Sequence, residues 1–166
     1  MLKTLTAAFA ACFLFTAAAS AQTEPAQSEA EQIARAYMAA YSAADWDAMA
    51  PYMADDILFA DHTNPDPSFQ SELHSRDAAL GMLRNFGETY GAIELGFEWA
   101  TIFESNGVVV FSGFVNSYGA PPGQPTAYRW RAEQVSVVVV ADGRVVRHED
   151  FANYAGAQVS RAPRPN

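Results

Sequence analysis

The chain has 166 residues, of which 50% are hydrophobic and 13% aromatic. This is about one domain's worth of sequence, with enough apolar side chains for a substantial core. The formal net charge is -9 at pH 7. Such an acidic chain disfavours nucleic acid and anionic membrane surfaces, because both require a basic face that neutralises phosphates. We therefore expect neither of them as a partner.

The first 21 residues have the pattern of a secretory signal. Lys3 supplies a positive start, Leu5 to Ala18 is apolar, and Ala19-Ser20-Ala21 offers small residues for cleavage. The apolar run is short for a bilayer span, and a retained anchor is the minor alternative. Cleavage before Gln22 predicts a periplasmic or secreted protein. It also removes Cys12, the only cysteine, which leaves no disulfide and no thiol nucleophile.

Residues 22–28 form a polar leader, and the first helix is expected to follow. Apolar residues recur at three-and-four spacing from Glu29 to Ala44, which predicts a helix with one buried face. Asp45 is a good N-cap for a second, short helix that buries Trp46. Pro51 removes a backbone donor, so this helix is expected to kink or end early.

A strand is predicted from Ile57 to Asp61, followed by a proline-containing loop to about His74. Ser75 then caps a third helix, which is expected to end near Gly87 or Gly91. Alternating apolar residues separated by turn signals predict the remaining strands, which are expected at 97–103, 108–114, 128–140 and 145–154.

Helices followed by antiparallel strands indicate an α+β fold in a single domain, which we place at residues 29–154. Residues 155–166 read as a weakly ordered, flexible tail.

This order of elements resembles a known superfamily. The NTF2-like superfamily has a similar order of elements. In this chain the order is a helix, Asp45-Trp46-Asp47, a helix, Ala54-Asp55-Asp56, a strand, a helix and three long strands. The closing segment from Asp142 to Phe151 resembles its SnoaL-like branch of polyketide cyclases and related proteins. The resemblance implies a cone of three N-terminal helices packed in a strongly curved, mostly antiparallel sheet. It also implies an apolar cavity for a small apolar or aromatic organic ligand.

Within that superfamily the steroid Δ5-isomerases offer a chemical template. Their pattern has a tyrosine eight residues before the capping aspartate, as Tyr37 stands before Asp45. It also has a basic aspartate at the end of the strand after Ala-Asp-Asp, where Asp61 stands five residues after Asp56. The resemblance implies that Tyr37 is an oxyanion donor and Asp61 a general base.

The third residue of the template, a protonated aspartate on a late strand, has no clean match. Val135 falls at its position, and Glu133 is in phase two residues earlier. A true steroid isomerase would then lose one of the two donors to its carbonyl oxygen.

The residues themselves support the same chemistry. Asp61 follows Ile57 and Phe59 at spacing two, so it points to the apolar side of its strand and should be a better base near neutral pH. Alternatively, Asp61 caps the following turn. The alternative for Tyr37 is an ordinary core tyrosine whose hydroxyl is satisfied by a neighbour.

Two further groups of polar residues are candidates. His148 and Asp150 share one face of the last strand, and the resemblance to cyclases and epoxide hydrolases implies that Asp150 faces the cavity, with His148 as an acid or base. The alternative is a surface or dimer-edge pair. Arg129, Arg131 and Glu133 share a face that either orients acids in the site or forms the solvated side of its strand.

The predicted site therefore has a catalytic set and a ligand-binding set. The catalytic set is Asp61, Tyr37, His148 and Asp150, and the ligand-binding set is Tyr41, Trp46, Phe59, Glu133 and Arg131. Tyr41 and Trp46 also suit a role as core walls.

No cofactor or metal is predicted. The sequence has no glycine-rich phosphate loop, no Gly-x-Ser-x-Gly elbow and no CxxC pair. A metal site of Asp61, His62, His148 and Asp150 is disfavoured, because strand neighbours such as Asp61 and His62 point to opposite faces.

Two functional hypotheses follow. The first is an exported enzyme that transfers protons without a cofactor, in the isomerase, cyclase or lyase style. The second is a non-catalytic binding or dimeric accessory module, and a homodimer is expected in either case. A purely structural oligomer would instead fill its own cavity.

Overall fold

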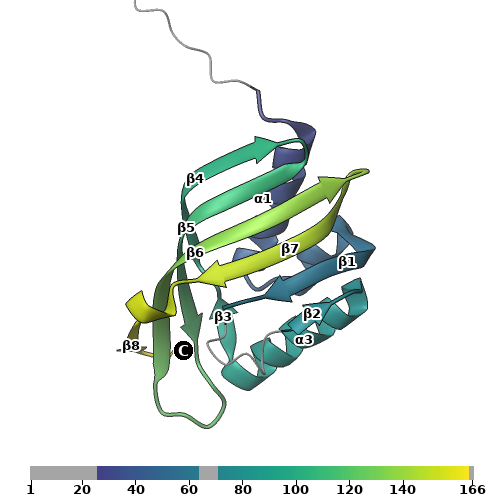
Figure 1. Cartoon of the computed structure of the whole chain (residues 1–166). Helices are drawn as coiled ribbons and strands as arrows, with labels where there is room; N and C mark the ends of the chain where they lie inside the picture. Colours follow the sequence, from purple (N-terminus) through teal and green to yellow (C-terminus); the bar gives the residue numbers. More distant parts are fainter. Residues whose placement is uncertain (1–25, 64–70, 165–166) are drawn as a thin grey trace, which may run out of the picture.

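A computed structural model describes residues 26–63 and 71–164 (Figure 1). The helical elements are α1 (Glu29–Ser42), α2 (Trp46–Met49), η1 (Ala50–Tyr52), α3 (Arg76–Tyr90) and η3 (Tyr154–Gly156). The strands are β1 (Met53–Asp61), β2 (Ser71–Leu73), β3 (Ala92–Glu94), β4 (Phe97–Ser105), β5 (Val108–Gly119), β6 (Ala127–Ala141), β7 (Arg144–Ala152) and β8 (Gln158–Ala162). The predicted α+β class is confirmed.

The helix ends follow local sequence signals. The side chains of Asp45 and Ser75 accept hydrogen bonds from backbone N–H groups in the first turns of α2 and α3. α2 stops at Met49 and passes into the 3₁₀ turn that holds Pro51, as the missing donor of a proline requires. α3 ends at Gly91, whose φ of 57° is in the left-handed region. These predicted boundaries are confirmed.

The strands form one mixed sheet in the order β2-β1-β7-β6-β5-β3, with β4 also paired to β5 and β8 to β6. β1 and β7 are parallel, and the other pairs are antiparallel. The long strands β5 and β6 change neighbours along their length, so the sheet curls. α1 lies against the face formed by β4 to β7, and α3 lies beside β1 (Figure 1).

The core fills the space between α1 and the inner face of the sheet. Tyr37, Phe59, Phe111 and Val138 are fully or almost fully buried there, and each such side chain stabilises the fold by roughly 1.5–3 kcal/mol before entropy is counted. A bulge in β4 between Trp99 and Thr101 lies opposite Gly113. A Cβ at that position would overlap the backbone of β4, which explains the glycine.

The sequence prediction of a weakly ordered tail from residue 155 is wrong for its described part. Gln158–Ala162 forms β8, which pairs with β6 in a register that sets Arg129 opposite Ser160. β7 pairs with β6 only from Gln134 onward, so the first part of β6 would otherwise present an unpaired edge. The short strands β2 and β3 were also not predicted.

The predicted signal segment, residues 1–21, lies outside the described residues and stays a prediction. Within the described ranges, none of the helices combines the length and the hydropathy that crossing a bilayer would need.

Candidate functional site

A cavity of about 320 Å³ opens at the end of the curled sheet, beside α3. Met82, Leu83 and Phe86 of α3 form one apolar wall, and Phe97 of β4 and Val115 of β5 belong to the opposite side. Mostly apolar walls with few polar groups are the usual composition of a small-molecule site.

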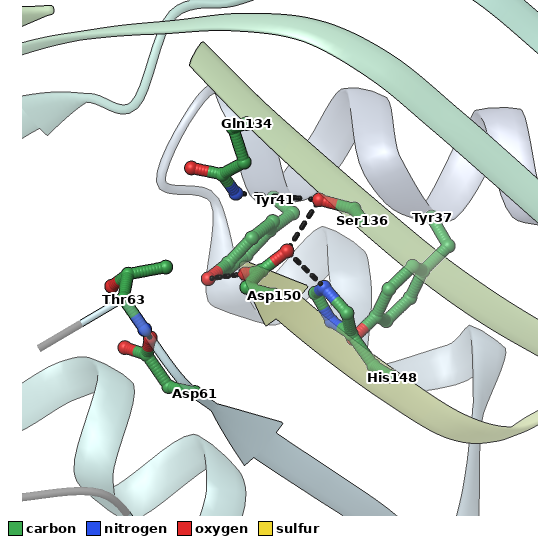
Figure 2. A network of polar contacts seen from close by, with 8 residues as sticks. All are labelled: Tyr37, Tyr41, Asp61, Thr63, Gln134, Ser136, His148 and Asp150. Carbon is green, nitrogen blue, oxygen red and sulfur yellow. Dashed lines mark hydrogen bonds and ion pairs between the residues drawn. The ribbon is translucent and has the colours of Figure 1, made fainter. Parts of the chain in front are cut away.

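The polar end of the cavity holds two carboxyl groups. Asp61 is the last residue of β1, and Asp150 lies near the end of the parallel neighbour β7; the two are register partners. Neighbouring strands lie about 4.8 Å apart, so the two acids sit side by side. Both line the cavity, and Figure 2 shows the two side chains with their polar neighbours.

Asp150 is held by a dense set of hydrogen bonds. Its Oδ1 accepts from Ser136 Oγ and faces His148 Nε2 at 3.0 Å, and its Oδ2 accepts from the Tyr41 hydroxyl at 2.9 Å. Burial alone would raise the pKa of Asp150, but the charge of His148 and these hydrogen bonds outweigh it and lower the pKa of the carboxyl. Asp150 is therefore a fixed, ionised carboxylate.

His148 links Asp150 to the core. Its Nδ1 lies 2.8 Å from the Tyr37 hydroxyl, while its Nε2 faces Asp150. Because an ionised carboxylate only accepts, Nε2 carries the proton toward Asp150. The imidazole is fully buried and makes edge contacts with the rings of Tyr41 and Phe59, at centroid distances of 4.9 and 4.8 Å. This packing fixes the ring that orients Asp150.

Asp61 has a different environment. Its Oδ1 accepts a hydrogen bond from the backbone N–H of Thr63 at 2.8 Å, so the predicted turn cap and the cavity-lining carboxyl are the same group. Burial, followed by the negative charge of Asp150, raises the pKa of Asp61 against the lowering effect of the Thr63 hydrogen bonds and of His148. The two neighbouring acids thus have pKa values displaced in opposite directions.

Several predicted site residues lie behind or away from the cavity. Tyr37 and Phe59 are fully buried, and neither lines the cavity. The Tyr37 hydroxyl is engaged with His148, as the alternative of a core tyrosine expects, and a direct contact between Tyr37 and a bound molecule stays a prediction. Trp46 packs against the core and borders a separate surface depression near Arg84. His148 is likewise a buried neighbour of the cavity, while Tyr41 lines it as expected.

Arg131 and Glu133, predicted as ligand contacts, are on the outer face of β6. Arg131 forms an ion pair with Glu98 at 2.8 Å, and Glu133 accepts a hydrogen bond from Asn153 Nδ2 at 3.1 Å. Both residues therefore belong to the solvated side of their strand, which is one of the two alternatives that the sequence left open. The even-numbered residues of β6 face inward instead, including Trp130 and Gln134, which line the cavity.

Sequence reasoning missed several residues of the site. Ser136 and Gln134 form a chain in which the Gln134 amide donates to Ser136 Oγ at 3.3 Å and Ser136 donates to Asp150. The large aromatic residues Tyr128 and Trp130 occupy even positions of the strand, as Gln134 and Ser136 do, and this could have indicated that the even positions face inward. The odd positions also carry apolar valines, so the sequence did not distinguish the two faces. Tyr154 also lines the cavity, from a segment that was expected to end the domain.

The alternative metal site does not assemble. His62 stacks on Phe151 at a centroid distance of 4.8 Å and lies 3.8 Å from Glu149, so it is on the opposite face from Asp61 and Asp150. No trio of His, Cys, Asp or Glu suited to a metal ion occurs within residues 26–63 and 71–164.

The helices, the curled sheet and the cavity at its open end define an NTF2-like cone fold. A model of the SnoaL-like domain matches residues 34–148, and the chain belongs to that family. No curated protein matches the chain.

Solved structures agree on the fold. A protein assigned to the SnoaL-like polyketide cyclases, from Shewanella denitrificans, is 18% identical with a TM-score of 0.66, over 78% of this chain and 93% of that one. An NTF2-like protein of unknown function from Burkholderia pseudomallei is 20% identical with a TM-score of 0.62, over 78% and 94%. A hypothetical protein with a ketosteroid isomerase-like fold from Catenulispora acidiphila, solved in complex with trimethylamine, is 14% identical with a TM-score of 0.57, over 74% and 86%.

Proposed function

We propose that the protein binds a small organic molecule in this cavity and catalyses proton transfer on it without a cofactor. The observation that carries the proposal is the pair Asp61 and Asp150, two adjacent carboxyls in one apolar cavity with oppositely displaced pKa values. Such a separation of two acids typifies an acid–base site. The trimethylamine in the Catenulispora structure supports an organic occupant for this fold.

In the proposed reaction Asp61 is the base. Its carboxylate takes a proton from a C–H group next to a carbonyl, holds it as the carboxylic acid, and returns it to another carbon of the same molecule. No atom is gained or lost, so the net reaction is an isomerisation. The raised pKa of Asp61 favours this role, because a base near its operating pH transfers protons most effectively. Asp150 stays ionised and keeps Tyr41 in place.

One observation favours the second candidate, a binding protein without turnover. Two polar side chains that line the cavity already donate within the protein: the Tyr41 hydroxyl to Asp150 and the Gln134 amide to Ser136. A carbonyl oxygen that gains charge needs donors aimed at it. A binding module has no such requirement.

The variant Asp61→Asn separates the two candidates. The probe is 2-indanone in D₂O, an apolar aromatic ketone whose α-carbons take up deuterium when a base removes their protons, as NMR detects. We expect the wild type to accelerate this exchange and Asp61→Asn to lose roughly 10²-fold or more of the acceleration, with affinity for 2-indanone changed little. Glu133→Gln, on the outer face of β6, is the matched control.

Equal exchange in wild type and Asp61→Asn would remove the enzyme proposal and leave the binding module. Secretion and assembly as a homodimer stay predictions of the sequence.

A further inference from the structure

The cavity has no cationic side chain in its described lining. The chain's lysine and arginine residues number ten, and apart from Lys3 they are arginines that all lie within the described ranges. None of these arginines lines the cavity. Residues 64–70, which are not described, have the sequence Asn-Pro-Asp-Pro-Ser-Phe-Gln and contain no basic residue. The described lining thus offers no positively charged partner for a carboxylate or phosphate group.

The arginines nearest in sequence to the site pair elsewhere. Arg129 and Arg131, which flank the cavity-lining Trp130, reach Glu94 and Glu98 on the outer side of the sheet. Arg147, next to His148, pairs with Glu149. His148 itself is fully buried, is turned toward Asp150 and Tyr37, and does not line the cavity, so it makes no direct contact with a bound molecule.

The walls of the cavity are rich in aromatic rings. Tyr41 and Phe97 stack at a centroid distance of 5.4 Å, and Trp130 and Tyr154 meet at 5.6 Å. All four line the cavity. The faces of such rings carry partial negative charge and attract cations, and tryptophan does so most strongly.

The two carboxyls complete an environment suited to positive charge. Asp150 accepts three hydrogen bonds from described residues, and a carboxylate has about four lone-pair sites, so it can accept one more from a ligand. Asp61 stands beside it as its register partner. The net charge of -9 also draws cations toward the protein as a whole.

We infer that the cavity selects organic amines, bound as ammonium ions with an apolar or aromatic body. The ammonium group lies against Asp150 and Asp61, and its carbon body lies between the aromatic walls and α3. This deepens the proposed function and rests on it, since the substrate of the same cavity is then a carbonyl compound that also carries an ammonium group.

The test uses molecules that share one carbon body and differ in charge. Indan-2-amine is a cation at neutral pH, indan-2-ol is neutral but can donate a hydrogen bond, and indane-2-carboxylate is an anion. Binding to the full mature chain is followed by titration calorimetry and by tryptophan fluorescence. We expect the amine to bind at least tenfold more tightly than the alcohol or the carboxylate, which corresponds to about 1.4 kcal/mol.

Two variants locate the effect. Asp61→Asn should reduce the preference for the amine over the alcohol severalfold, and Trp130→Leu should weaken amine binding more than alcohol binding. Glu133→Gln should leave both affinities unchanged, because Glu133 is on the outer face. The salt dependence of amine binding should also exceed that of alcohol binding.

The inference is overturned if the alcohol or the carboxylate binds as tightly as the amine, or if none of the indane probes binds. Equally tight binding of the alcohol or the carboxylate does not affect the proposed proton transfer, because the deuterium exchange of 2-indanone is measured separately. A preference for the amine without any 2-indanone exchange supports the binding module with the same ligand class.

Discussion

Replacement of Tyr37 by phenylalanine distinguishes a structural tyrosine from a catalytic one. The variant Tyr37→Phe removes only the hydroxyl that lies 2.8 Å from His148 Nδ1. The ring keeps its edge contact with His148, at a centroid distance of 5.4 Å, so no cavity is opened in the core. The loss is confined to one buried hydrogen bond.

The expected cost follows from that geometry. Tyr37 and His148 are both fully buried, and a buried polar atom left without its partner costs about 1–3 kcal/mol. For a chain of this size each kcal/mol lowers Tm by about 2–4 °C, which gives a decrease of roughly 2–12 °C. Binding of 2-indanone and its deuterium exchange should change less than about threefold, whereas loss of an oxyanion donor typically costs about 10²–10³-fold.

Urea and thermal unfolding measure the stability, and NMR exchange measures the rate. Tyr118→Phe is the control, because the hydrogen bond that its hydroxyl donates to the Pro163 carbonyl is exposed, and loss of such a surface contact usually stays within about 0.5 kcal/mol. An unchanged Tm, or a large loss of exchange in a fully stable variant, would refute the reasoning and restore Tyr37 as a direct donor.

Two more predictions concern stability. The pKa of Asp61 is raised in the folded protein, so ionisation of this carboxyl destabilises the fold. This destabilisation is fully present at pH values above the folded pKa and is absent below the unfolded pKa of about 3.9. Asp61→Asn should therefore be more stable than the wild type at neutral pH, by about 0.5–2 kcal/mol, as is typical of stabilising substitutions. Urea titrations at several pH values should show that this gain in stability disappears toward acid pH. A gain in stability that grows toward acid pH would contradict the prediction. Gly113→Ala should destabilise by about 2 kcal/mol or more, because its Cβ would meet the β4 backbone, whereas Gly81→Ala in α3, with open space around it, should stabilise by about 0.5–1 kcal/mol. Thermal melts of the two alanine variants check this pair, and equal melting temperatures would argue against the bulge.

Local signals predicted most of the fold. The caps at Asp45 and Ser75, the break at Pro51 and the turn glycine at position 91 act within a few residues, so the helices could be placed from the sequence. The spacing of Ile57, Phe59 and Asp61 likewise fixed a shared strand face. β8 could not be predicted, because its pairing depends on how far β6 extends beyond β7.

The candidate site was predicted in part. The alternation of side chains along a strand predicted that His148 and Asp150 share one face. Only the curvature of the sheet shows that Asp150 reaches the cavity while His148 stays behind it. The same alternation places Glu133 and Gln134 on opposite faces of their strand, but it does not show which of the two faces inward. Tyr41 rather than Tyr37 reaches the cavity, although both lie on the buried face of α1 one turn apart.

The sequence by itself therefore determined the elements, the faces of those elements, and Asp61 and Asp150 as candidate acids, because these depend on neighbours in the chain. The tertiary structure alone decided which face encloses the cavity, that the two acids are register partners, and that no arginine joins them. The reason is physical: hydrogen-bond register and sheet curvature arise from contacts between residues far apart in sequence, such as β1 with β7. Those contacts also set the opposite pKa displacements on which the proposed chemistry depends.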